Sequence, residues 1–322
     1  MEENRAENQT PRRQHTQHPT HQAHKKKKSG TAKTVIGTIL AIGLTTCLMF
    51  FAIFMVYVHT SLDLNVDISA YTLKQSSTVY YQDKTSGEWV ELTKLHGVEN
   101  RTLVSIDDIP KHVRNALISI EDERFESHHG VDWHGTARAI LSTLFGGSVQ
   151  GGSTITQQLV KNVTGDNQNT VKRKVTEIYR ALDLEKRYEK DEILEAYLNE
   201  VYFGHSCYGV VTAAMTYFDK DVSELSLAEC ASLVAITNNP SLYDPIEAGW
   251  SRENNRERQL LVLGAMLDQE KISQEEYDAA KAEDIVFANG YTISGKYVGS
   301  DPSKGNDAST GSTGDTGDGS TG

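Results

Sequence analysis

The chain has 322 residues, enough for one sizeable domain with accessory segments or for two small domains. Its hydrophobic share of 38% and charged share of 24% are those of ordinary globular proteins. The formal net charge of −12 argues against nucleic acid as a main partner, because phosphate binding needs a basic surface. The three cysteines, Cys47, Cys207 and Cys230, are too few for a disulfide framework and lack zinc-site spacing.

Residues 1–33 form a polar, basic segment without apolar periodicity, and we expect a disordered tail there. Residues 34–58 then contain no charged side chain. As a helix this segment would span about 37 Å, against about 30 Å for the hydrocarbon core of a bilayer. A buried core helix is rarely so long and apolar on all sides, and a cleaved signal peptide has a shorter apolar run. The sequence therefore predicts one retained transmembrane helix over 34–58.

The lysines Lys25 to Lys28 precede this apolar segment, and no comparable cluster follows it. Basic segments beside a membrane span stay on the cytoplasmic side. The pattern predicts a single-pass protein of a bacterial cell membrane, with a cytoplasmic N-terminus and the remainder of the chain outside.

Residues 59–103 have the pattern of a stalk with short strands. The segments 76–81 and 88–93 are rich in β-branched and aromatic residues, and they flank a turn-like segment, 83–87. We therefore expect a pair of strands between the membrane helix and the folded domain.

Residues 104–287 are predicted to form one folded domain of mainly α (α+β) class, because their periodicity is helical. The longest helical stretch covers 171–201, with a break near Tyr188 and Lys190. Further helices are predicted over 225–235, 259–270 and 273–281. Residues 288–322 are rich in Gly, Ser, Thr and Asp, a composition that predicts a disordered tail.

The first segment with candidate chemistry runs from Glu121 through Asp122 and Phe125 to Asp132. Its acids lie near Phe125 and Trp133, which suggests carboxylates beside an apolar wall that would raise their pKa and favour proton transfer. A solvated acidic helix end is the alternative, and composition alone favours it. Zinc binding by the nearby histidines is disfavoured because no HExxH motif is present.

The second segment, 151–162, has two glycines before a predicted helix start, with Thr154 and Gln157 at capping-box spacing. Gln158 and Lys161 would lie on the same face of that helix. A glycine-rich loop leading into a helix is a natural anion site. A capped amphipathic helix without a ligand explains the pattern equally well.

Two further segments follow. Arg173 and Glu177 are one helical turn apart, which fits either a functional pair or an ordinary surface ion pair. Residues 190–199 have the pattern of an amphipathic helix that supports a site without supplying chemistry.

Together and in this order, the four segments resemble the successive motifs of the family 51 glycosyltransferases. That family comprises monofunctional peptidoglycan glycosyltransferases and the N-terminal enzyme of class A penicillin-binding proteins. The matching letters are EDERFxxHHGVD from Glu121, GGSTITQQLVKN from Gly151, RKVTE from Arg173 and KDEILEAYLNEVYFG from Lys190. The similarity covers about residues 106–281, over half of the chain.

The resemblance implies a lysozyme-like, mainly helical glycosyltransferase domain that polymerises lipid II into glycan strands, with inversion and release of a polyprenyl pyrophosphate. Glu121 would be the catalytic base and Glu177 the second essential carboxylate, with Mg²⁺ or Mn²⁺ as a possible ion at Glu177. The substrate-binding positions would be Asp122, Phe125, Arg138, Ser153, Thr154, Gln157, Gln158, Lys161, Arg173 and Lys174.

The resemblance also implies partners other than the substrate. Residues 140–149 correspond to a lobe that touches membrane lipid, with core packing as the alternative for Leu141, Leu144 and Phe145. Other cell-wall synthesis and division proteins are further expected partners.

One departure from the family's pattern bears on the site. Many members carry an arginine where this chain has Asn169, which puts a phosphate contact in doubt. No serine is followed three places later by lysine, so the acylating enzyme of class A proteins is not in this sequence. The sequence leaves open a monofunctional protein or a shortened bifunctional one. A catalytically idle membrane scaffold and a lysozyme-like glycan hydrolase are the competing functions.

Overall fold

The computed structural model describes residues 29–61, 66–68, 77–95, 100–145, 151–166, 168, 170–247 and 249–299. The chain divides into two units, Met1–Leu62 and Asp63–Gly322, which are described separately below. Residues 1–28, 300–322 and Asn169 lie outside the described residues, so the expectations of disorder in the two tails remain predictions.

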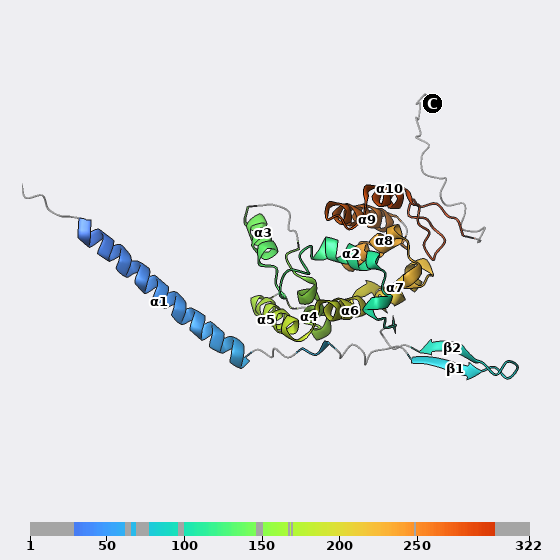
Figure 1. Ribbon diagram of the computed structural model, residues 1–322, viewed down its shortest axis with the longest axis horizontal. Helices are drawn as coiled ribbons and strands as arrows, with labels where there is room; N and C mark the ends of the chain where they lie inside the picture. Colours follow the sequence, from blue (N-terminus) through green and yellow to red (C-terminus); the bar gives the residue numbers. More distant parts are fainter. Residues whose placement is uncertain are drawn as a thin grey trace, which may run out of the picture. The chain divides into compact units, whose positions relative to one another are not determined.

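Helix α1, Ser29–Ser61, makes up the described part of the first unit (Figure 1). Its segment Lys33–Tyr57 is long and apolar enough to cross a membrane, and none of it is buried within the protein. The hydroxyls of Thr38 and Thr46 donate to backbone carbonyls one turn earlier, at 2.9 and 2.7 Å, which satisfies them within an apolar helix.

The two predicted strands are confirmed as an antiparallel hairpin of β1, Ser77–Gln82, and β2, Trp89–Leu95. Asp83 shapes the turn between them, because its Oδ1 accepts a hydrogen bond from Thr85 N at 2.7 Å. A second, small sheet has the order β3-β5-β4, in which β5 runs parallel to β3 and antiparallel to β4. In this sheet β3 is Asn100–Arg101, β4 is Tyr202–Gly204 and β5 is Cys207–Tyr208.

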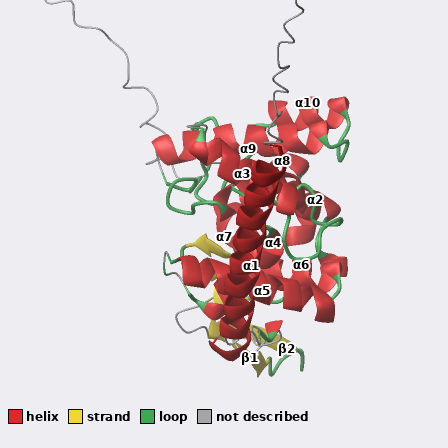
Figure 2. Ribbon diagram, turned by 90° about the vertical axis from the view of Figure 1, so that its left-hand side faces the viewer, coloured by secondary structure: helices red, strands yellow, loops and turns green. Residues whose placement is uncertain are grey.

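The other regular elements of the domain are helices (Figure 2), which confirms the predicted fold class of a mainly α domain that follows an apolar N-terminal helix in the sequence. The predicted break near Tyr188 is confirmed, because one helix ends at Arg187 and the next begins at Lys190. The α-helices are α2 Lys111–Glu121, α3 Trp133–Leu144, α4 Ile155–Thr164, α5 Val171–Arg187, α6 Lys190–Glu200, α7 Val210–Phe218, α8 Leu227–Thr237, α9 Trp250–Asp268 and α10 Gln274–Ala282. Two short 3₁₀ helices, η2 and η3, cover Ile106–Asp108 and Val222–Glu224.

Two groups of helices position the site (Figure 1). In the first, α2, α9 and the almost completely buried α8 pack against one another. In the second, α4 packs on α5 and α6. One hydrophobic core runs through both groups, so the ends of α2 and α4 are fixed relative to each other.

The N-terminal boundary of the domain lies earlier than the predicted residue 104. Arg101 of β3 is 1% exposed; it forms an ion pair with Glu200, and its Nη1 donates to Asn199 O at 2.8 Å. Residues of the predicted stalk also belong to the domain, because Val66 and Ile68 are buried in its core. A buried arginine and two isolated apolar residues have no helical periodicity, which is why the sequence pattern missed them.

The C-terminal boundary lies later than the predicted residue 287. Ala288 N donates to Tyr217 O at 2.9 Å, and Asn289 Nδ2 donates to Ile246 O at 2.7 Å. Ile293 is buried, and isolated β-bridges join Val286 to Thr292 and Tyr291 to Tyr297. The prediction of disorder from residue 288 is therefore wrong for 288–299, where backbone bonds to the domain compensate for a polar composition.

Arg101→Met is expected to lower the free energy of unfolding by about 3–5 kcal/mol, because it leaves the Glu200 carboxylate buried without its main cation. The exposed pair of Arg187 and Asp183 supplies the control, since Asp183→Asn should cost less than about 1 kcal/mol. Denaturant unfolding of the detergent-solubilised protein, followed by circular dichroism, measures both values. Equal effects of the two substitutions would contradict this account of the boundary.

Candidate functional site

A cleft of about 1120 Å³ crosses the described part of the domain. The end of α2, the loop 151–154, and helices α3, α4, α5 and α9 contribute to its walls. All the predicted site residues except Phe125 line this cleft: Glu121, Asp122, Arg138, Ser153, Thr154, Gln157, Gln158, Lys161, Arg173, Lys174 and Glu177.

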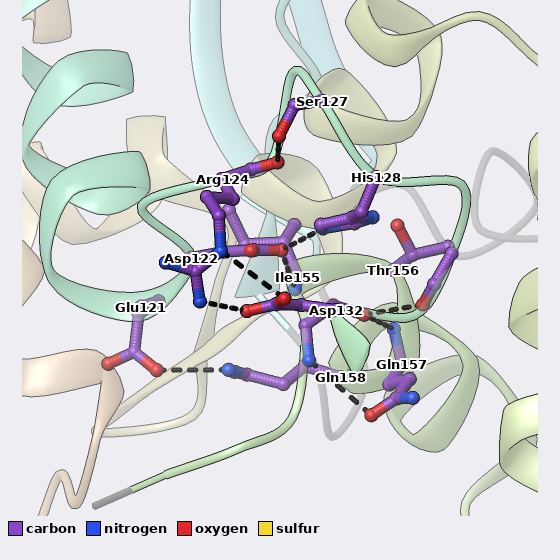
Figure 3. A network of polar contacts seen from close by, with 12 residues as sticks. Glu121, Asp122, Arg124, Ser127, His128, Asp132, Ile155, Thr156, Gln157 and Gln158 are labelled. Atoms are coloured by element: carbon purple, nitrogen blue, oxygen red, sulfur yellow. Dashed lines mark hydrogen bonds and ion pairs between the residues drawn. The ribbon is translucent and has the colours of Figure 1, made fainter. Parts of the chain in front are cut away.

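Glu121 is the last residue of α2, and its side chain in the cleft is 13% exposed. Gln158 Nε2, from α4, donates to Glu121 Oε2 at 2.9 Å (Figure 3). Arg258 Nη2, from α9, donates to the other oxygen, Oε1, at 3.2 Å. Three helices therefore converge on one carboxylate.

The apolar wall predicted beside this carboxylate is not what the described residues form. Trp133 is 61% exposed and does not line the cleft. Phe125 is completely buried in the hydrophobic core, with Lys190 Nζ 4.4 Å from its ring centroid. Phe125 is thus corrected from a substrate-binding residue to a packing residue, because a side chain with no exposed surface cannot touch a substrate in this conformation.

Asp122 lines the cleft, but both hydrogen bonds of its Oδ2 hold the fold together (Figure 3). Ile155 N, at the start of α4, donates to it at 2.9 Å, and His128 Nε2 lies at the same distance. The carboxylate is nearly buried, so these contacts are worth more than at the surface. Asp122 joins the end of α2 to the beginning of α4.

The capping box predicted at the start of α4 is confirmed. Thr154 Oγ1 accepts from Gln157 N at 3.1 Å and donates to Gly130 O at 2.8 Å, and Gln157 Oε1 accepts from Thr154 N at 3.4 Å. Together with Asp122 these side chains occupy N–H groups at the helix start that a free anion would use. Thr154 and Gln157 therefore shape the cleft through the cap.

Glycines allow the loops around this cap to approach the helices closely. At Gly130, where φ is +84°, a Cβ would lie 2.5 Å from Ala181 O of α5. A Cβ on Gly152 would lie 2.9 Å from the Cβ of Ala139, on α3. Any larger residue at either position would have to displace a helix that lines the cleft.

Glu177 is buried on α5, and both of its oxygens are engaged by cations. Arg173 pairs with Oε2 and Lys174 pairs with Oε1. Lys174 Nζ also donates to Ser153 Oγ at 2.8 Å and to Gln157 Oε1 at 3.1 Å. Glu177 thus holds two cations beside the loop that precedes α4.

These contacts do not fit a divalent ion held by protein ligands at Glu177. Both carboxylate oxygens already face positive groups, and Mg²⁺ or Mn²⁺ needs several oxygen ligands. Within the described ranges, no three His, Cys, Asp or Glu side chains are grouped as a metal site would require.

The charges that line the cleft separate into paired and unpaired groups. Arg258 pairs with Glu121, Arg124 pairs with Asp132, and the two cations on α5 pair with Glu177. The side chains of Arg138, on α3, and Lys161, on α4, form no ion pair or hydrogen bond with any residue that the structure describes. These two exposed cations are available to an anionic ligand.

Comparison with known proteins assigns this arrangement to a family. The family model described as transglycosylase matches residues 88–267, more than half of the chain and most of the domain that contains the cleft. The chain belongs to the transglycosylase family. This confirms the resemblance to family 51 glycosyltransferases that the four motifs indicated.

Related proteins are much longer than this chain. It is 46% identical to penicillin-binding protein 1F of Bacillus subtilis over 196 residues, which is 61% of this chain and 26% of that protein. It is 36% identical to penicillin-binding protein 1A of Clostridium botulinum over 284 residues, 84% of this chain and 33% of the relative. The crystal structure of penicillin-binding protein 1A from Haemophilus influenzae matches with 25% identity and a TM-score of 0.37, over 67% of this chain and 21% of that one. The chain thus spans about a third or less of the length of these relatives.

Among the residues of this transglycosylase cleft that sequence reasoning missed, Arg258 and Tyr197 bear on Glu121. Arg258 is 137 positions from Glu121, so no local spacing could connect them. Tyr197 lies within the fourth motif, and its hydroxyl donates to Gln158 Oε1 at 3.0 Å. The only sequence signal for Tyr197 was its place in the fourth motif. The amphipathic pattern of that motif predicted a supporting helix and did not single out Tyr197.

Asp122→Ala is expected to destabilise the transglycosylase domain by about 1–3 kcal/mol for each partner left unpaired, Ile155 N and His128. Glu126→Ala, at an exposed position outside the cleft, should leave stability unchanged within about 0.5 kcal/mol. Thermal and denaturant unfolding measure the difference. Asp122→Ala protein with wild-type stability would show that Asp122 does not anchor α4.

Proposed function

We propose that this protein is a peptidoglycan glycosyltransferase that polymerises lipid II into glycan strands, with Glu121 as general base. One observation carries the proposal: the carboxylate of Glu121, held by contacts from two other helices, lies in the same cleft as two cations that have no ion-pair partner among the described residues. Membership of the transglycosylase family supports the reaction class.

The proposed reaction transfers a glycan chain to a sugar hydroxyl. Glu121 takes the proton from the 4-hydroxyl of the acceptor, the lipid-linked disaccharide-peptide. That oxygen forms a bond with the anomeric carbon of the growing strand, while the bond from this carbon to the pyrophosphate oxygen breaks with inversion. The electron pair leaves with the polyprenyl pyrophosphate. A positioned base contributes about 10²–10⁴ in rate to such a step.

Positive charge on the other side of the reacting carbon would stabilise the departing pyrophosphate. Among the cations that line the cleft, Arg138 and Lys161 have no carboxylate partner within the described residues, and we assign them this contact. Lys174, which donates to Ser153, also lines the cleft, and its ion pair with Glu177 orients it. Fixed positive groups that face a developing anion often stabilise the transition state more than any other feature of an enzyme.

A lipid-linked substrate requires the cleft to work near a membrane. Helix α1 supplies an apolar segment of sufficient length, and the lysines before it favour a cytoplasmic N-terminus and an extracellular catalytic domain. Leu141, on α3, and Phe145, just after its end, are 53% and 85% exposed, which suits contact with lipid. Residues 146–149 of the expected lipid-touching segment lie outside the described residues. Other cell-wall synthesis and division proteins are proposed as further partners.

Glu121→Gln is expected to reduce glycan polymerisation from purified lipid II by at least about 10²-fold, because an amide cannot accept the hydroxyl proton. The matched control is Glu126→Gln, an exposed acid outside the cleft that should polymerise at the wild-type rate. Gel separation of the glycan products in detergent micelles measures both. A folded Glu121→Gln protein with wild-type activity would overturn the assigned base, and wild-type protein that binds substrate without polymerising it would favour the scaffold function.

Arg138→Ala and Lys161→Ala should each lower kcat/KM about tenfold to hundredfold, because each removes a charge-assisted contact worth about 1.5–3 kcal/mol. Lys172→Ala removes an exposed cation that does not line the cleft and should have no effect. Initial rates of polymerisation over a range of lipid II concentrations supply the values. Losses as large for Lys172→Ala would mean that general surface charge, and not this pair, binds the pyrophosphate.

A further inference from the structure

We infer that Arg258 and Tyr197 are positioning residues for the base: Arg258 holds one carboxylate oxygen of Glu121 directly, and Tyr197 holds the other through Gln158. The inference rests on the proposed function, because it takes Glu121 as the group that accepts the proton. It adds two residues outside the acidic and glycine-rich motifs to the machinery of the same site.

The contact to Glu121 Oε2 depends on Tyr197, on α6, which acts through Gln158. Its side chain is 1% exposed, and burial, followed by the charge of Glu121, raises the pKa of its hydroxyl well above the ordinary value. The hydroxyl therefore stays protonated and donates to Gln158 Oε1 at 3.0 Å. With its oxygen held there, the amide of Gln158 must present its NH₂ group to Glu121.

These two hydrogen bonds, from Tyr197 to the amide oxygen and from the amide NH₂ to Glu121, fit only one orientation of the Gln158 amide. A flipped amide would place its NH₂ group against the Tyr197 hydroxyl and its oxygen against the carboxylate of Glu121, two acceptors facing each other. The carboxylate of Glu121 thus requires the NH₂ group of Gln158, and the Tyr197 hydroxyl, by donating to Gln158 Oε1, holds the amide in the orientation that makes the 2.9 Å contact drawn in Figure 3.

The contact to the other oxygen, Glu121 Oε1, comes from Arg258, on α9. Its Nη2 lies 3.2 Å from Glu121 Oε1, and its guanidinium carbon lies 5.2 Å from the ring centroid of Tyr243. The side chain is only 16% exposed, so packing and the aromatic ring restrict its rotation. By contrast, the neighbouring Arg256 contacts Gln259 and the carbonyl of Lys281 and does not line the cleft.

Held at both oxygens, the Glu121 side chain cannot rotate about its terminal bond without breaking a hydrogen bond. A misplacement of about 1 Å in a reacting group can cost about 10²-fold in rate, so restricting the base to one orientation contributes to kcat. Neither Arg258 nor Tyr197 needs to touch the substrate for this effect, and KM should therefore change little.

The test compares purified full-length variants in glycan polymerisation from lipid II. Arg258→Ala should lower kcat about tenfold to hundredfold and leave KM within about twofold of wild type. Tyr197→Phe should also lower kcat without a comparable change in KM. Arg256→Ala is the matched control and should behave as wild type. Methylguanidinium added to Arg258→Ala should restore part of the rate, whereas methylammonium, of equal charge but without the planar fork, should restore less.

The outcomes separate this inference from the function on which it rests. Wild-type protein that makes no polymer would overturn both. If the wild type makes polymer and Arg258→Ala keeps the wild-type kcat, the inference is overturned and the proposed function stands. A change in KM alone for Arg258→Ala leads to the same conclusion. If thermal unfolding shows that Arg258→Ala is not folded, Arg258→Lys decides: a folded lysine variant with the wild-type kcat would contradict positioning by the guanidinium geometry.

Discussion

The buried carboxylate of Asp122 is the contact on which the geometry of the cleft depends. It accepts a hydrogen bond from the first N–H group of α4 and directly follows the last residue of α2. Because of this, Glu121 at the end of α2 and Gln158 in the first turns of α4 are held within hydrogen-bonding distance. The neighbouring capping box of Thr154 and Gln157 then fixes the loop that carries Ser153. The two adjacent acids therefore have different roles: Asp122 stabilises the fold, and Glu121 presents its carboxylate to the cleft.

The second organising feature is the way charges are distributed in the cleft. Buried Glu177 gathers two cations on α5, and Arg258 faces Glu121. Carboxylates and cations that neutralise each other can be enclosed at moderate cost, whereas an unpaired buried charge would be expensive. Arg138 and Lys161, which lack such partners in the described part of the chain, are exposed. The cleft can therefore receive an anionic group at Arg138 and Lys161 without first losing an ion pair between described residues.

Local chemistry was the part of this structure that sequence patterns predicted well. Capping at Thr154, the break at Tyr188 and the hairpin around Asp83 all depend on residues within a few positions of each other. The family followed from the order of four such segments. Contacts between distant segments were not predictable in this way. The pairing of Arg258 with Glu121 and the burial of Arg101 against Glu200 arise only when separate helices and strands pack together.

Phe125 shows the opposite error, because a motif names a residue without showing which way it faces. Its place among acids suggested a wall of the site, yet it packs in the core and supports the loop behind Asp122. The domain boundaries failed for a related reason: residues 66–68 and 288–299 join the domain through single buried side chains and backbone bonds, which leave no periodic signal.

The most direct test of the central claim is to count the polyprenyl pyrophosphate released per glycosidic bond formed when the purified wild-type protein acts on lipid II. A cleft that combines a base with cations for a pyrophosphate leaving group predicts one molecule released for each new bond. Shortening of finished glycan without any pyrophosphate release would contradict the account and assign the cleft to hydrolysis.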